Sequence, residues 1–110
     1  MSYGTLGKSI PTANTLMTAY TISANCLLAE INIAVVNSTA GIATVDIAIS
    51  TSATPSANEY IAKNYPVEAL TGFLEINDQL AFPGELIVIR SDKADTIFRV
   101  SGKELTTVSS

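Results

Sequence analysis

The sequence contains no histidine and no tryptophan, and Cys26 is its only cysteine. Most general acid/base, nucleophilic and metal-dependent chemistry uses histidine or cysteine side chains. The residues that these mechanisms usually require are missing or scarce in this sequence. We therefore expect a protein that is not an enzyme and that needs neither a metal nor another cofactor. A single cysteine also excludes an internal disulfide, which fits synthesis inside a cell.

Charged residues are scarce as well. They make up 15% of the chain, against about 25% in typical soluble domains. The net charge is −4 and the six basic residues form no run, so we expect no direct binding to nucleic acid, whose phosphates attract clustered lysine and arginine. No stretch approaches the roughly 20 apolar residues of a membrane span. Residues 1–17 lack the apolar core of a signal peptide, so synthesis in the cytoplasm is expected.

Small polar and apolar residues take the place of the missing charges. Hydrophobic residues, alanine among them, make up 47% of the chain, and serine and threonine fill much of the rest. A weakly charged surface is suited to being covered by neighbouring proteins, because the cores of protein interfaces are depleted in charge. The alternative is a small β domain that its hydroxyl groups keep in solution.

Apolar and polar residues alternate along several short segments. Strand side chains point alternately to two faces, so residues 26–37 and 43–50 are predicted to be strands with one apolar face. Turn-forming residues between them predict that these two strands pair as a hairpin. A turn is also predicted at Asn77-Asp78. Further strands are predicted at residues 15–22, 70–76, 86–90 (buried on both faces) and 96–102, with an exposed loop at 51–58 and a short strand or helical turn at 59–63.

Seven or eight short strands without a long helical pattern predict an all-β protein. The expected fold is an antiparallel β-sandwich, immunoglobulin-like or jelly-roll-like, with an extended N-terminal arm. Residues 1–13 are expected to form that arm, irregular because glycine and proline interrupt it. The sandwich domain is expected over residues 14–105 and a C-terminal tail over 106–110.

The order of strands and turns includes several distinctive segments. Residues 20–24 (YTISA) run from a strand into a turn. An apolar strand ending in asparagine, a short loop and a second strand follow, here residues 30–50. Residues 80–85, the LIVIR segment at 86–90 and FRVSG at 98–102 come later. This order resembles a group of small virion domains of tailed bacteriophages, which have a strand-and-turn motif, commonly Tyr-Thr-Val-Pro-Ala, near their start; Ser23 replaces the usual proline here.

This resemblance implies a structural role in the virion. We expect a capsid decoration or cement protein, made in the host cytoplasm, that stabilises the head by binding across capsomers. Its expected partners are the major capsid protein and copies of itself in a homo-oligomer. One alternative is a tail, baseplate or fibre component bound to tail or fibre proteins. A different class is a receptor- or carbohydrate-binding module that uses Tyr60, Tyr65 and loop carboxylates.

Candidate contact residues come from the arm and from the loop-rich middle of the chain. Tyrosine is enriched at interface hot spots, while the alternative for such residues is packing at the core edge with the hydroxyl in solvent. Cys26 opens an apolar strand and is expected to pack as a small hydrophobic residue. The scattered carboxylates are expected to be solvated. The predicted partner-binding residues are Tyr3, Leu6, Ile10, Tyr60 and Tyr65.

Overall fold

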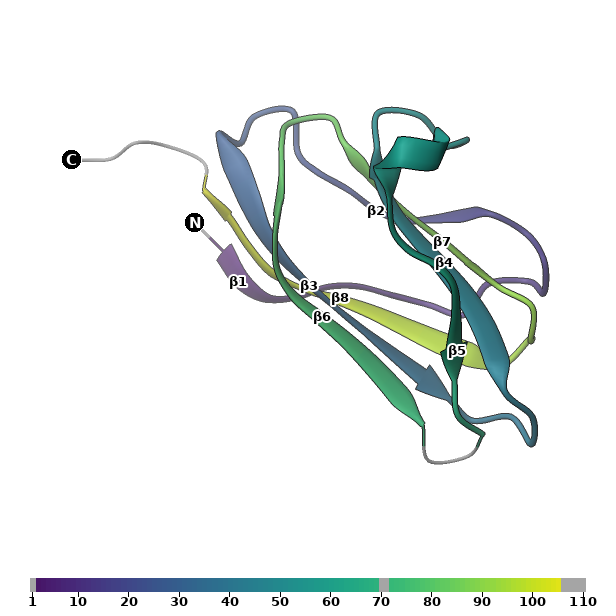
Figure 1. The fold of residues 1–110 in the computed structure, drawn as a ribbon. Helices are drawn as coiled ribbons and strands as arrows, with labels where there is room; N and C mark the ends of the chain where they lie inside the picture. The colour runs from purple at the N-terminus through teal and green to yellow at the C-terminus, as the bar shows by residue number, and fades with distance from the viewer. Residues whose placement is uncertain (1, 70–71, 106–110) are drawn as a thin grey trace.

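Two four-stranded antiparallel sheets stack face to face in the computed structural model, which describes residues 2–69 and 72–105 (Figure 1). The predicted antiparallel β-sandwich is therefore confirmed. Sheet A has the strand order β1-β8-β3-β6, and sheet B has the order β2-β7-β4-β5. The elements are β1 (Ser2–Ser9), β2 (Met17–Thr21), β3 (Leu28–Asn37), β4 (Ala43–Ser50), the 3-10 helix η1 (Ala57–Glu59), β5 (Tyr60–Val67), β6 (Phe73–Ala81), β7 (Leu86–Ser91) and β8 (Thr96–Leu105).

The core lies between the sheets and follows the alternation in the sequence. On β3 every second residue is buried, and Ile31, Ile33 and Val35 each expose 1% of their surface or less. In the LIVIR segment the three central residues, Ile87, Val88 and Ile89, are buried on both faces, as predicted, while Leu86 and Arg90 at its ends are half-buried. Each fully buried branched or aromatic side chain contributes about 1.5–3 kcal/mol through removal of apolar surface from water. The largest such side chain is Phe98 of β8.

The predicted hairpin between β3 and β4 is wrong. Strand β3 pairs with β6 and β8 in sheet A, whereas β4 pairs with β5 and β7 in sheet B. Two strands with one apolar face each can bury those faces side by side or against each other, and the alternating pattern is the same in both cases. The connecting residues 38–42 therefore cross from one sheet to the other.

Asn37 holds that crossing in place. Its buried side-chain amide donates to the carbonyl oxygens of Gly41, Val67 and Glu68 over 2.8–3.1 Å, and its Oδ1 accepts from the backbone N–H and the hydroxyl of Thr39. These bonds tie the end of β3 to the end of β5 in the other sheet. Buried backbone carbonyls need such partners, because leaving one unpaired is costly.

The N-terminal segment is not an irregular arm. Residues 2–9 form β1, which pairs antiparallel with β8 from Ser2 opposite Glu104 to Ser9 opposite Phe98. The register shifts once, between Thr5 and Gly7. A glycine is needed there, because a Cβ on Gly7 would lie 2.9 Å from the Ala19 carbonyl oxygen of sheet B. The sandwich thus begins at residue 2 and not at 14, and the expected tail at 106–110 lies outside the described residues.

The predicted turn at Asn77-Asp78 is a bulge inside a longer strand. Strand β6 continues to Ala81, and its register with β3 shifts between Ile31 and Ile33. Asp78 takes a φ of 61°, and its N–H donates to Asn32 Oδ1 at 2.9 Å. Asparagine and aspartate tolerate this left-handed conformation better than most residues. The turn-forming residues 77 and 78 therefore accommodate one extra residue in β6 opposite β3, instead of ending the strand.

The buried carboxylate of Glu104 accepts two hydrogen bonds from residues of other segments. Glu104 Oε2 accepts from the Tyr20 hydroxyl at 2.6 Å and from the Ser23 N–H at 2.9 Å. Burial, followed by the hydrogen bond and charge of Glu104, raises the pKa of Tyr20 to about 12. Burial and the same negative charge also raise the pKa of the Cys26 thiol. Cys26 is 4% exposed and belongs to the core cluster, in agreement with its predicted role in packing.

The Tyr20 contact makes stability depend on alkaline pH. An unfolded tyrosine keeps the ordinary pKa of 10.0 and the folded one has about 12, so below pH 10 both states hold the proton and the contribution of this contact to stability is fully present. Between these values the unfolded state loses the proton first, and the free energy of unfolding falls. We expect the fall over this pH range, measured by urea unfolding, to be shallower in Tyr20→Phe. Equal slopes for the two proteins would contradict the assignment.

Candidate functional site

The predicted contact residues do not form one surface. Tyr3 pairs with Lys103 and Leu6 lies at the register shift, both on the edge strand of sheet A; their side chains are outside the described part of the structure. Ile10 follows that strand and is 59% exposed. Tyr60 and Tyr65 belong to β5, the edge strand of sheet B on the opposite side of the sandwich.

A charged cluster lies on the outer face of sheet B. Asp46, in the middle of β4, exposes only 2% of its side chain. Its Oδ2 lies 3.2 Å from Arg90 Nη1 and 3.6 Å from Lys63 Nζ, while its Oδ1 accepts the Asn64 N–H at 2.7 Å. Register places Asp46 directly opposite Arg90 on β7. The carboxylate is therefore neutralised and hydrogen-bonded, as a buried charge must be.

The cluster also fixes the loop that precedes β2. Arg90 Nη2 donates to Asn14 Oδ1 at 3.0 Å, and the Asn14 N–H donates to the Ser91 carbonyl at 2.7 Å. Asn14 takes a φ of 59°, a conformation that asparagine tolerates. Asn14 is thereby held against the outer face of sheet B, beside the charged cluster.

A hollow of about 580 Å³ opens between this loop and β5. Lys63 forms part of its wall, and its Nζ lies 4.2 Å from the centroid of the Tyr60 ring, a cation–π contact. Tyr60 is thus brought to the hollow as a candidate binding residue, whereas Tyr65 is absent from the wall. The residues that line the hollow are Asn14, Thr15, Leu16, Asp46, Tyr60, Lys63 and Arg90.

The carboxylates near the hollow already have partners within the protein. Asp46 is held between two cations and a backbone N–H. Glu59, the last residue of η1 and the neighbour of Tyr60 in sequence, accepts hydrogen bonds from the Ser56 N–H and the Ser50 hydroxyl. Those bonds lower the pKa of Glu59. Within the described ranges no group of three or more histidine, cysteine, aspartate or glutamate side chains is placed to hold a metal ion.

Sequence reasoning missed the centre of this site. Asp46 was expected to be a solvated residue on the polar face of its strand, and Arg90 to be the end of an apolar strand. The useful signal was a charged residue between Val45 and Ile47, in a strand whose other neighbours are small or apolar. A charge placed there needs a partner of opposite sign. Only the register between β4 and β7 identifies that partner as Arg90.

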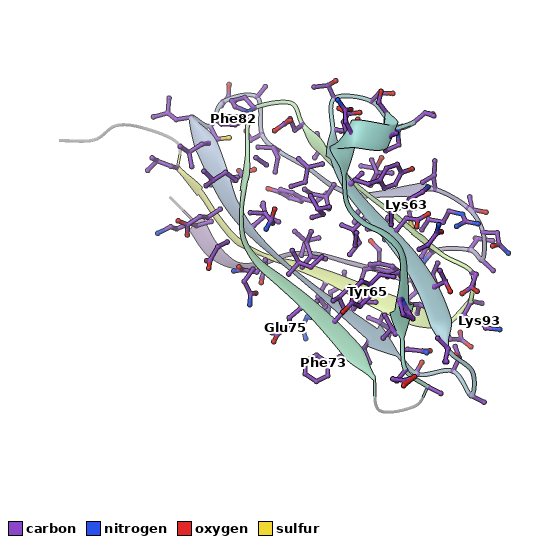
Figure 2. All side chains as sticks on the ribbon, in the orientation of Figure 1. Lys63, Tyr65, Phe73, Glu75, Phe82 and Lys93 are labelled. Carbon is purple, nitrogen blue, oxygen red and sulfur yellow. The ribbon has the colours of Figure 1, made fainter. Side chains whose placement is uncertain are left out.

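A second feature is the apolar surface on the outer face of sheet A. Leu80 near the end of β6 and Phe82 just after it are 55% and 54% exposed, and Phe73 at the start of β6 is 67% exposed. Phe73 pairs with Val36, which is itself 40% exposed. Figure 2 shows Phe73 and Phe82 at opposite ends of this edge strand, with Glu75 on the strand between them.

The end of sheet A near Phe82 is also hollowed. Leu28 pairs with Leu105 and Glu30 with Lys103 in neighbouring strands. These four residues line a depression of about 270 Å³. We call this region, together with Leu80 and Phe82, the apolar end patch. It has an apolar floor with one acid and one base at its rim, the composition of a small protein-binding surface.

Comparisons with protein-family models, with curated proteins and with solved structures find no match. Among the described residues, no helix has the length and apolar character needed to cross a membrane.

Proposed function

We propose that this chain is a structural protein of a tailed-bacteriophage virion, a decoration or cement protein that binds across capsomers of the head. The observation that carries the proposal is the exposed apolar surface at both ends of β6. Three large apolar side chains there are each more than half exposed. Exposed apolar patches commonly mark interaction sites, and here two such patches lie at opposite ends of β6 with Glu75 between them. The resemblance of the strand and turn order to small virion domains supplies the partner class.

The surface suits attachment without turnover. Each copy would bury the apolar end patch and the region around Phe73 against the shell, at about 25 cal/mol per Å² of apolar surface removed from water. Strand pairing places Arg99 and Glu75 on either side of Ala34, between Phe73 and the apolar end patch. Charges at such a position affect the orientation of the bound protein more than its affinity. Copies that also contact one another on the shell gain further binding affinity through multivalency.

The predicted N-terminal contact residues do not come from an irregular arm in this proposal. Residues 2–9 are part of sheet A and pair with β8, so they contribute an edge strand. Ile10, exposed just beyond that edge, remains a proposed contact. Rigid surfaces bind with a smaller entropic cost than segments that must first become ordered.

The test is binding of the purified chain to empty capsids from which accessory proteins have been removed. Wild-type protein is expected to bind saturably. The Leu80→Ser/Phe82→Ser variant is expected to bind about tenfold more weakly or worse, a loss of at least about 1.4 kcal/mol. Both side chains are more than half exposed, so the fold should be retained, which circular dichroism and thermal unfolding check.

Met17→Ser is the matched control, because Met17 is also an exposed apolar residue but lies on β2 of sheet B. It should bind shells as the wild type does. Equal losses of binding affinity in both variants would show that the outer face of sheet A is not the interface with the shell. Binding to isolated tails or fibres with none to shells would replace the decoration role by the alternative of a tail, baseplate or fibre component.

A further inference from the structure

The hollow on the outer face of sheet B carries more positive than negative charge, in a chain whose net charge is −4. Two cations, Lys63 and Arg90, converge on the single carboxylate of Asp46. That carboxylate is already bound by the Asn64 N–H and Arg90 Nη1. The Lys63 ammonium stands 3.6 Å from it, and its side chain is 55% exposed. One positive charge is therefore left for a ligand.

The position of that charge is set by the surrounding residues. The Tyr60 ring holds the Lys63 ammonium over the wall of the hollow at 4.2 Å, instead of leaving it extended into solvent. Asp46 and Asn14 hold the two terminal nitrogens of Arg90. A site whose groups are held before binding loses little conformational entropy when the ligand arrives. Figure 2 shows Lys63 projecting from β5 beside β4.

The remaining walls indicate what else the ligand contains. Asn14 and Thr15 bring an amide and a hydroxyl to the hollow, and Leu16 brings an apolar surface. Asn14 Oδ1 already accepts from Arg90 and the Thr15 hydroxyl already donates to the Ala13 carbonyl, so ligand hydroxyls can accept from the Asn14 NH₂ group and donate to the Thr15 oxygen, while C–H groups pack on leucine. The volume of about 580 Å³ lies within the roughly 300–1,000 Å³ of small-molecule sites. A bare inorganic anion would use the cations and leave the rest of the hollow empty.

We propose that this hollow binds an acidic saccharide, a sugar that carries a carboxylate. The carboxylate pairs with the Lys63 ammonium and the outer edge of the Arg90 guanidinium. The sugar hydroxyls bond to Asn14 and Thr15, and its C–H face lies on Leu16. Tyr60 acts as a positioning residue for Lys63. This site is on the sheet opposite the apolar end patch and does not depend on the proposed attachment to a shell.

The test uses titration of the ¹⁵N-labelled chain with sodium glucuronate, followed by nuclear magnetic resonance. Saturable shifts are expected at Asn14, Thr15 and Lys63. Glucose and inorganic phosphate are the comparison ligands, one lacking the charge and the other lacking the sugar. Both are expected to bind at least about tenfold more weakly than glucuronate, equivalent to about 1.4 kcal/mol. Phosphate binding as tightly as glucuronate, or glucose doing so, would overturn the assignment to an acidic saccharide.

Two lysine variants separate the site from general attraction of anions. Lys63→Gln should weaken glucuronate binding about tenfold or more, and Lys63→Arg should restore most of it. Lys93→Gln is the matched control, because Lys93 lies in the β7–β8 connection, away from the hollow (Figure 2). Its binding should equal that of the wild type. No saturable shift with wild-type protein, or equal binding by Lys63→Gln, would show that the cluster only locks the loop to the sheet.

Discussion

Gly102→Ala is expected to lower the free energy of unfolding by more than about 4 kcal/mol, a range reached only by the most disruptive single substitutions. Gly102 lies in β8 between β1 and β3, paired with Gly4 and Ile31. A Cβ there would overlap the Glu30 carbonyl oxygen and lie 3.2 Å from the Ile31 Cα. Both are backbone atoms in the centre of sheet A, so no side chain can move aside to make room.

The backbone conformation adds to this effect. Gly102 has a φ of 136°, which residues with a side chain rarely adopt. Gly84→Ala is the matched control: its φ is 83°, but no atom lies within 4 Å of the added Cβ. It should lose only about 1–2 kcal/mol, the cost of a left-handed residue. Chemical denaturation of the two variants measures the difference, and comparable losses would mean that the contact with Glu30 is not the main cost.

Asp46→Ala is expected to lower the free energy of unfolding by about 3 kcal/mol. The substitution removes the acceptor of the Asn64 N–H and the counter-charge of Arg90. The loss should lie near the lower end of the range for broken buried ion pairs, because the side chains of Arg90 and Lys63 are 31% and 55% exposed. Water can solvate the cations that are left behind.

Glu75→Ala serves as the control for Asp46→Ala, since Glu75 is an exposed carboxylate on β6 of the other sheet. Its effect should stay within about 0.5 kcal/mol, as is usual for surface positions. Replacing Asp46 should also release the loop at Asn14, which hydrogen exchange of the Asn14 amide would report. A loss below about 1 kcal/mol, with that amide still protected, would show that the cluster does not hold the outer face of sheet B together.

The fold class could be predicted because alternation is a local property. Ile31, Ile33 and Val35 mark one face of β3, and the run before Arg90 marks a strand between two neighbours. Strand pairing could not be predicted in the same way. The apolar faces of β3 and β4 fit either a shared sheet or opposed sheets, and the contacts that join each strand to its neighbours are distant in sequence; those of Asn37 with Val67 and Glu68 span about 30 residues.

The N-terminal strand and the charged hollow were hidden for related reasons. Glycine and proline suggested an irregular arm over residues 1–13. Backbone pairing of residues 2–9 with the edge of β8 outweighs that local preference. Tyr60 was identified as a candidate binding residue, and it lines the hollow. Its companions come from three separate segments: the register of sheet B brings Asp46 and Arg90 together, and a hydrogen bond to Arg90 adds Asn14 from the loop before β2.

The most direct test of the proposed function is cryo-electron microscopy of stripped capsids saturated with the purified chain. We expect symmetric density on the shell in which the outer face of sheet A, with Phe73 and the apolar end patch, contacts the capsid surface. The hollow beside Lys63 is then expected to face away from the shell. Saturated shells without added density, or density in which the outer face of sheet A points to solvent, would contradict the proposal.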